Sequence, residues 1–94
     1  MRFTGHVRAI LDTQGIQGVP AEYGAILMVE PLTSYPKEGL KVKMEGRSMT
    51  VISVMANHAF FDPKLEGCIG IAVDEHGLEA EGLAGAFIYA SGHA

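Results

Sequence analysis

The sequence has little of several features that would assign it to a specific class of protein. Cys68 is its only cysteine, so the chain forms no internal disulfide and has no cysteine-based zinc motif, which favours a reducing, cytoplasmic compartment. The longest apolar runs, such as 25–29, are too short to cross a bilayer. The first residues carry charges and no apolar segment with a cleavage site, so we expect neither a signal peptide nor a membrane partner.

Basic residues are few and dispersed. The formal charge is −4, and the seven basic residues occur singly rather than in a run. They provide no stripe that could neutralise successive phosphates, so we expect no nucleic-acid partner. With 94 residues, 48% of them hydrophobic and 19% charged, the chain has the composition of a single folded domain that spans 1–94.

Hydrophobic spacing and turn residues predict both strands and helices. Period-two alternation predicts strands, whereas Pro20 and the cap residue Ser48 each precede an apolar segment in the manner of a helix start. The expected order is strand 2–11, helix 20–29, a hairpin of 32–35 and 40–44 around the turn at 36–39, helix 48–56, strand 68–73 and helix 79–90.

This order predicts an α+β domain, an open-faced sandwich in which a small antiparallel sheet carries three helices on one face. The side chains expected in its core are those of Val7, Leu27, Ile52, Ile69, Ile71 and Phe87.

Residues 15–21 read Gly-Ile-Gln-Gly-Val-Pro-Ala and resemble the active-site segment of the histidine-containing phosphocarrier (HPr) family, Gly-Leu-His-Ala-Arg-Pro-Ala. Gln17 stands where that family has its phosphoryl-accepting histidine, and Val19 stands where it has an arginine. A glutamine amide is not a nucleophile under these conditions, so the resemblance implies a member that cannot carry phosphohistidine. Gln17 is then either a polar loop residue or part of a docking surface that no longer accepts phosphate.

Residues 47–56 resemble the second signature of the same family, in which a basic residue and a regulatory serine precede an apolar helix. The interval from Gln17 to Ser48 equals the family's interval between histidine and serine, and the expected order of elements is also similar. Ser48 has two interpretations, as a helix cap or as a phosphorylation site beside Arg47, and both stay open.

The resemblance implies a non-catalytic, HPr-like regulatory domain of the phosphotransferase system that needs no cofactor and binds a protein partner. Met49 is the first candidate contact, because a short helix cannot bury every side and methionines adapt to a partner. The expected partner-binding residues are Ile16, Gln17, Arg47, Ser48, Met49 and Ile52.

Two other classes of function stay open. His58 and Asp62 form an acid–base pair beside Phe60 and Phe61 in the long connection 57–67, where they would line the pocket of a small enzyme or ligand-binding protein. Alternatively, the chain is an obligate homo-oligomer that buries an apolar face against a second copy. The four histidines include no helical i, i+4 pair and no accompanying carboxylate cluster, so we expect no metal site.

Overall fold

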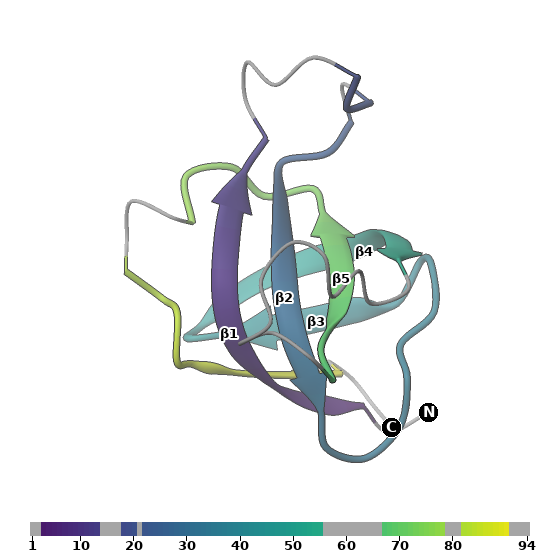
Figure 1. The fold of residues 1–94 in the computed structure, drawn as a ribbon, viewed down its shortest axis with the longest axis vertical. Helices are drawn as coiled ribbons and strands as arrows, with labels where there is room; N and C mark the ends of the chain where they lie inside the picture. Colours follow the sequence, from purple (N-terminus) through teal and green to yellow (C-terminus); the bar gives the residue numbers. More distant parts are fainter. Residues whose placement is uncertain (1–2, 14–17, 21, 56–66, 79–81, 91–94) are drawn as a thin grey trace.

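The chain folds as a closed, antiparallel β-barrel. The computed structural model describes residues 3–13, 18–20, 22–55, 67–78 and 82–90. Its strands are β1 (Thr4–Asp12), β2 (Ala25–Pro31), β3 (Lys41–Met44), β4 (Arg47–Met55), β5 (Ile69–Val73) and β6 (Phe87–Ala90). They pair in the order β1-β2-β5-β4-β3-β6, and β6 returns to β1 (Figure 1).

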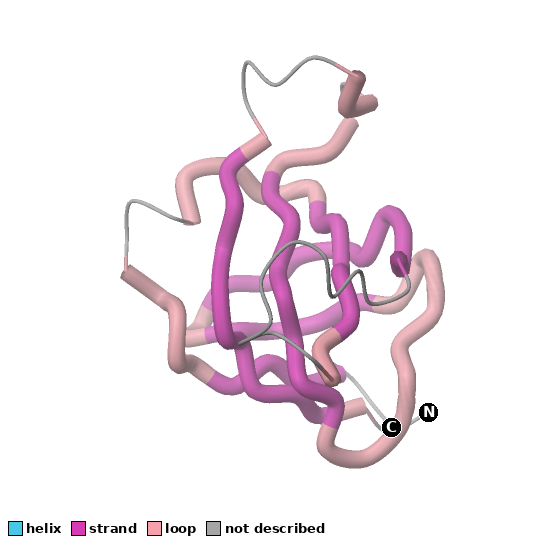
Figure 2. The backbone as a smooth tube through the Cα atoms, in the orientation of Figure 1, coloured by secondary structure: helices cyan, strands magenta, loops and turns pink. Residues whose placement is uncertain are grey.

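The expected α+β sandwich with three helices is wrong, and so is the fold that the HPr resemblance implies. The described residues contain strands, turns and loops but no helix (Figure 2), and therefore no helix that could cross a membrane. The strands predicted over 2–11 and 68–73 are confirmed as β1 and β5. The first half of β1 alternates between buried and more exposed residues, as a strand with one buried face requires, whereas every residue of β5 is buried.

The segment predicted as the first helix is strand β2. Ala25, Leu27 and Val29 point into the barrel and are buried, whereas Ile26 and Met28 point outward and are half-buried. Because both faces are apolar, the same residues satisfy the helical spacing of three and four as well as the strand spacing of two. Pairing with β1 on one side and β5 on the other decides in favour of the strand.

The segment predicted as the second helix is strand β4. It is rich in β-branched residues such as Thr50 and Val51, whose stiff side chains favour extended backbone. β4 pairs with β3 across a two-residue turn at Glu45 and Gly46, which have φ angles of 52° and 82°. Two positive φ angles are typical of a type I′ hairpin turn, so the hairpin lies here and not around 36–39.

The last predicted helix is also wrong. Residues 87–90 form β6, and the preceding Gly82 and Gly85 have φ angles of 67° and 100°, which lie outside the right-handed helical region. Residues 79–81 lie outside the described residues.

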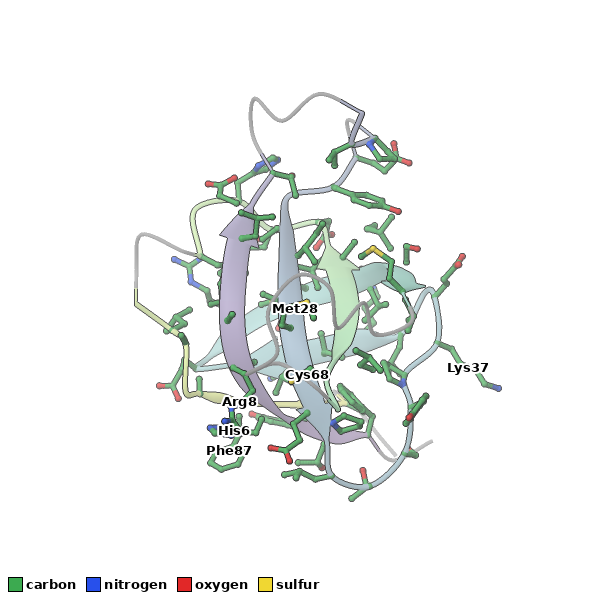
Figure 3. The ribbon with its side chains drawn as sticks, viewed as in Figure 1. His6, Arg8, Met28, Lys37, Cys68 and Phe87 are labelled. Atoms are coloured by element: carbon green, nitrogen blue, oxygen red, sulfur yellow. The ribbon has the colours of Figure 1, made fainter. Side chains whose placement is uncertain are left out.

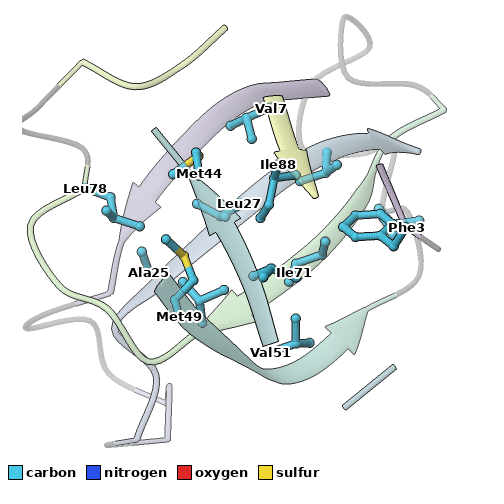
Figure 4. Close-up of a cluster of buried hydrophobic side chains, with 14 residues drawn as sticks. Phe3, Val7, Ala25, Leu27, Met44, Met49, Val51, Ile71, Leu78 and Ile88 are labelled. Carbon is cyan, nitrogen blue, oxygen red and sulfur yellow. The ribbon is translucent and has the colours of Figure 1, made fainter. Parts of the chain in front are cut away.

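The hydrophobic core fills the barrel interior (Figure 4). Of the predicted core residues Val7, Leu27, Ile69 and Ile71 are confirmed, Ile52 is half-buried, and Phe87 is exposed, so the prediction for Phe87 is wrong. Further buried side chains are those of Phe3, Ala25, Val29, Val42, Met44, Met49, Val51, Val73, Leu78 and Ile88.

Candidate binding surface

Strand β6 presents two aromatic side chains to solvent. Ile88 points into the core, and by alternation Phe87 and Tyr89 point outward, where they are 56% and 45% exposed. The strand is firmly held, because the ladder to β1 continues beyond it. Val7 N–H donates to the carbonyl oxygen of Ala86 at 2.9 Å, and Ala90 N–H donates to that of Phe3 at 2.8 Å. The two aromatic side chains are therefore exposed on a rigid strand and not on a loop.

His6 on β1 stacks against Phe87. The ring centroids are 5.0 Å apart at an interplanar angle of 30°, and the two residues are register partners across the β1–β6 ladder. Figure 3 shows both side chains at one side of the barrel, close to Arg8. His6 Nε2 lies 3.1 Å from the carbonyl oxygen of Gly85. Because a carbonyl oxygen only accepts, Nε2 carries the hydrogen in this contact, and the bond holds the imidazole against Phe87.

Three further residues extend this surface across neighbouring strands. Tyr89 pairs with Thr4 of β1 on one side and with Lys43 of β3 on the other. Leu32, which is 52% exposed, donates its N–H to the carbonyl oxygen of Thr4 at 2.8 Å, so it lies beside the same row. We refer to the outer surface formed by Thr4, His6, Leu32, Lys43, Phe87 and Tyr89 as the aromatic face.

The charges around the aromatic face differ in whether they have a partner. Arg8 and Glu30, both about half exposed, form an ion pair at 3.1 Å and largely neutralise each other. Lys41 donates to the hydroxyl of Thr50 at 3.4 Å. Among the described residues, no ion pair joins Lys43 or Glu45 to an opposite charge. Lys43 and Glu45, on the β3 side of β6, therefore carry opposite charges that no described residue neutralises.

The structure separates the predicted partner-binding residues of β4. Met49 is 3% exposed in the barrel core, so it contributes nothing to the surface. Ser48 is exposed opposite Lys43, but it caps no helix because it lies within a strand. Arg47 pairs with Glu75 at 2.6 Å, and Ile52 is half-buried at the register irregularity between Val51 and Ser53. The helix that was expected to present these residues to a partner is the strand β4.

The remaining predicted site residues lie outside the described residues. These are Ile16 and Gln17 of the HPr-like segment, and His58, Phe60, Phe61 and Asp62 of the alternative pocket. In the described segments, no three His, Cys, Asp or Glu side chains gather closely enough to hold a metal ion.

Cys68 is buried and directly precedes β5. Burial raises the pKa of its thiol, because desolvation disfavours the thiolate; the nearby Arg8 lowers this pKa and Glu30 raises it. A neutral thiol is a poor nucleophile, so Cys68 behaves as a small apolar side chain.

The sequence reasoning missed the aromatic face because it placed 79–90 in a helix with Phe87 in the core. A usable signal was present, since Phe87, Ile88, Tyr89 and Ala90 follow Gly85 as a short aromatic and β-branched run of the kind that favours a strand. The partners of these residues on β1 and β3 are 40 or more positions away, and no local pattern identifies them.

Comparisons of the chain with models of protein families, with curated proteins and with solved structures found no match. The fold and the aromatic face therefore carry the functional argument.

Proposed function

We propose that this chain is a non-catalytic protein-interaction domain whose partner docks on the aromatic face. The observation that carries the proposal is that Leu32, Phe87 and Tyr89, each about half exposed, lie together on adjoining segments of one barrel wall. Water contact with large apolar side chains is unfavourable, and a gathered apolar surface is typical of an interaction site. Association with a partner would remove this surface from water.

The closed barrel determines how such a partner would be recognised. Each described strand has a hydrogen-bonded neighbour on both sides, so a partner cannot simply add a strand to a free sheet edge. Recognition therefore depends on side chains. Tyrosine is enriched among the residues that dominate binding energies, and the stacked pair of His6 and Phe87 is already ordered before a partner arrives.

Charge favours a protein over a nucleic acid as the partner. The chain carries a formal charge of −4, and Arg8 near the aromatic face is already paired with Glu30. Lys41 and Lys43 alone would release few counterions from a phosphate backbone. We place the interaction in the cytoplasm, the compartment that a single unpaired cysteine favours.

Site-specific photo-crosslinking tests this proposal in the cells that produce the protein. Benzoylphenylalanine would replace Phe87 in one variant and Leu11 in a matched control. Leu11 is 48% exposed, and it lies about 17 Å along β1 from His6. We expect a discrete protein adduct from position 87 that is absent from position 11 and is competed by excess unlabelled wild-type protein.

A surface variant completes the experiment. Phe87→Ser should abolish the competition while leaving the melting temperature close to that of the wild type, because Phe87 is exposed and Ile88 keeps its place in the core. Equal crosslinking from both positions, or none from position 87, would show that no protein docks on this face.

A further inference from the structure

Opposite charges lie at the two halves of the aromatic face, Lys43 within it and Glu45 at its border. A line across the strands through Gly5, Ile88 and Met44 divides it, because these inward-facing residues are register partners of one another. Thr4, Tyr89 and Lys43 lie on one side of this line. On the other side lie His6 and Phe87, with Glu45 directly after Met44 at the start of the hairpin turn.

This layout is self-complementary. A twofold axis that lies along the dividing line, in the plane of the face, brings each half of one copy onto the opposite half of a second copy. Tyr89 then packs on Phe87 of the second copy, and Lys43 approaches Glu45 of the second copy. Twofold symmetry forms each contact twice, as in any isologous interface.

We infer that the protein that docks on the aromatic face is a second copy of this chain, packed face to face about this axis; the inference rests on the proposed function. Two observations favour a second copy over an unrelated protein. Lys43 and Glu45 have no ion-pair partner among the described residues, and the symmetric arrangement gives each of them one. The exposed rings gain stacking partners in the same step.

The expected dimer is weak and depends on concentration. A standard interface buries about 800 Å² on each partner, which is about one-seventh of the 5417 Å² accessible surface of this chain. The aromatic face is formed by six residues, fewer than a standard interface uses. We therefore expect a dissociation constant in the micromolar range or above.

Sedimentation velocity over a concentration series, from low micromolar to near millimolar, tests the inference with charge-exchange variants. Lys43→Glu and Glu45→Lys should each weaken the dimer by about tenfold or more, because each creates two like-charge contacts. The double variant should recover wild-type association, since the exchange restores both ion pairs. Glutamate and lysine are both L-residues other than glycine, so the positive φ at position 45 costs about the same in the wild type and in the variants.

Lys37→Glu is the matched control. It changes the net charge by the same amount as Lys43→Glu. Because Lys37 lies on the opposite side of the molecule from Phe87 (Figure 3), the substitution should leave association unchanged. Circular dichroism and thermal melting of each variant show whether the barrel is intact.

The outcomes separate this inference from the proposed function. A wild-type chain that stays monomeric, while crosslinking at position 87 captures a different protein, overturns the second copy and leaves the interaction domain standing. A dimer that the double variant fails to recover overturns the twofold arrangement. A wild-type chain that stays monomeric and gives no adduct from position 87 overturns both the dimer and the proposed function.

Discussion

Replacing Met49 with alanine is the sharpest test of the β4 strand. The HPr-like interpretation places this side chain on a partner-binding helix, whereas the barrel places it in the core at 3% exposure. Met49 pairs in register with Val42 of β3, and both side chains point inward. The two interpretations therefore differ in the stability of the variant and not only in its binding.

The expected loss of stability follows from burial. The change removes three heavy atoms of the size of methylene groups, worth about 0.8 kcal/mol each, or about 2.4 kcal/mol in transfer free energy. A residual cavity of about 40 Å³ at about 24 cal/mol per Å³ adds about 1 kcal/mol. The sum of about 3 kcal/mol is a large part of the total free energy of unfolding of a domain of this size, which is about 5–14 kcal/mol. Met49→Asp should unfold the domain, because it buries an unpaired carboxylate.

Chemical and thermal denaturation measure this loss. A cost of about 3 kcal/mol lowers the melting temperature by about 12–24 °C in a domain of this length. Ser48→Ala is the control, since Ser48 is the exposed neighbour on the same strand and should change stability by less than about 0.5 kcal/mol. A cost below about 1 kcal/mol for Met49→Ala would refute the inward orientation of Met49 and the register of β4.

Three other measurements test separate parts of the barrel. Gly24→Ala should lower the free energy of unfolding by about 2 kcal/mol or more, because the added Cβ would overlap the carbonyl oxygen of Glu75. Gly70→Ala is the control and should be tolerated, because its Cβ would meet no atom closer than 3.4 Å. Similar losses of stability from both variants would contradict the packing around Gly24. Burial raises the pKa of the Cys68 thiol above its ordinary value of 9.0, so the unfolded chain loses this proton first. The contribution of Cys68 to stability should therefore be constant well below pH 9.0 and fall as the pH rises beyond it, and Cys68→Ser should lack this fall; denaturation of both proteins at several pH values measures it. Arg47→Ala should lower the free energy of unfolding by less than about 1 kcal/mol, because its ion pair with Glu75 is about one-third exposed. A double-mutant cycle that gives an interaction energy of about 3 kcal/mol or more would contradict this solvent exposure of the pair.

The fold that the HPr resemblance implies shows how a local pattern can mislead about secondary structure. The resemblance rests on two short segments, of which 47–56 requires a helix, whereas Arg47–Met55 of that segment form β4. A run with apolar residues on nearly every position fits a helix and a strand equally well. The spacing between the two segments is a property of the chain in one dimension, and it says nothing about which strands become neighbours in the barrel.

Some features followed directly from local sequence. Alternation identified β1, and the spacing of Ile69, Ile71 and Val73 identified β5, although every residue of β5 is buried. The apolar character of Val7, Leu27, Ile69 and Ile71 placed them in the core, because hydrophobicity is a property of the residue itself. The single cysteine likewise excluded an internal disulfide.

Only the tertiary structure decided the remainder. β6 lies between β1 and β3, so the register that joins Phe87 to His6 and Tyr89 to Lys43 bridges separations of 81 and 46 positions. Such pairings depend on closure of the whole barrel, which satisfies the backbone hydrogen bonds of each described strand on both sides. The sequence alone thus determined that the chain buries one hydrophobic core and which of its segments alternate. Closure determined that Met49 faces the core and that Phe87 faces solvent, because the inward or outward direction of a strand residue depends on the neighbours with which the strand pairs.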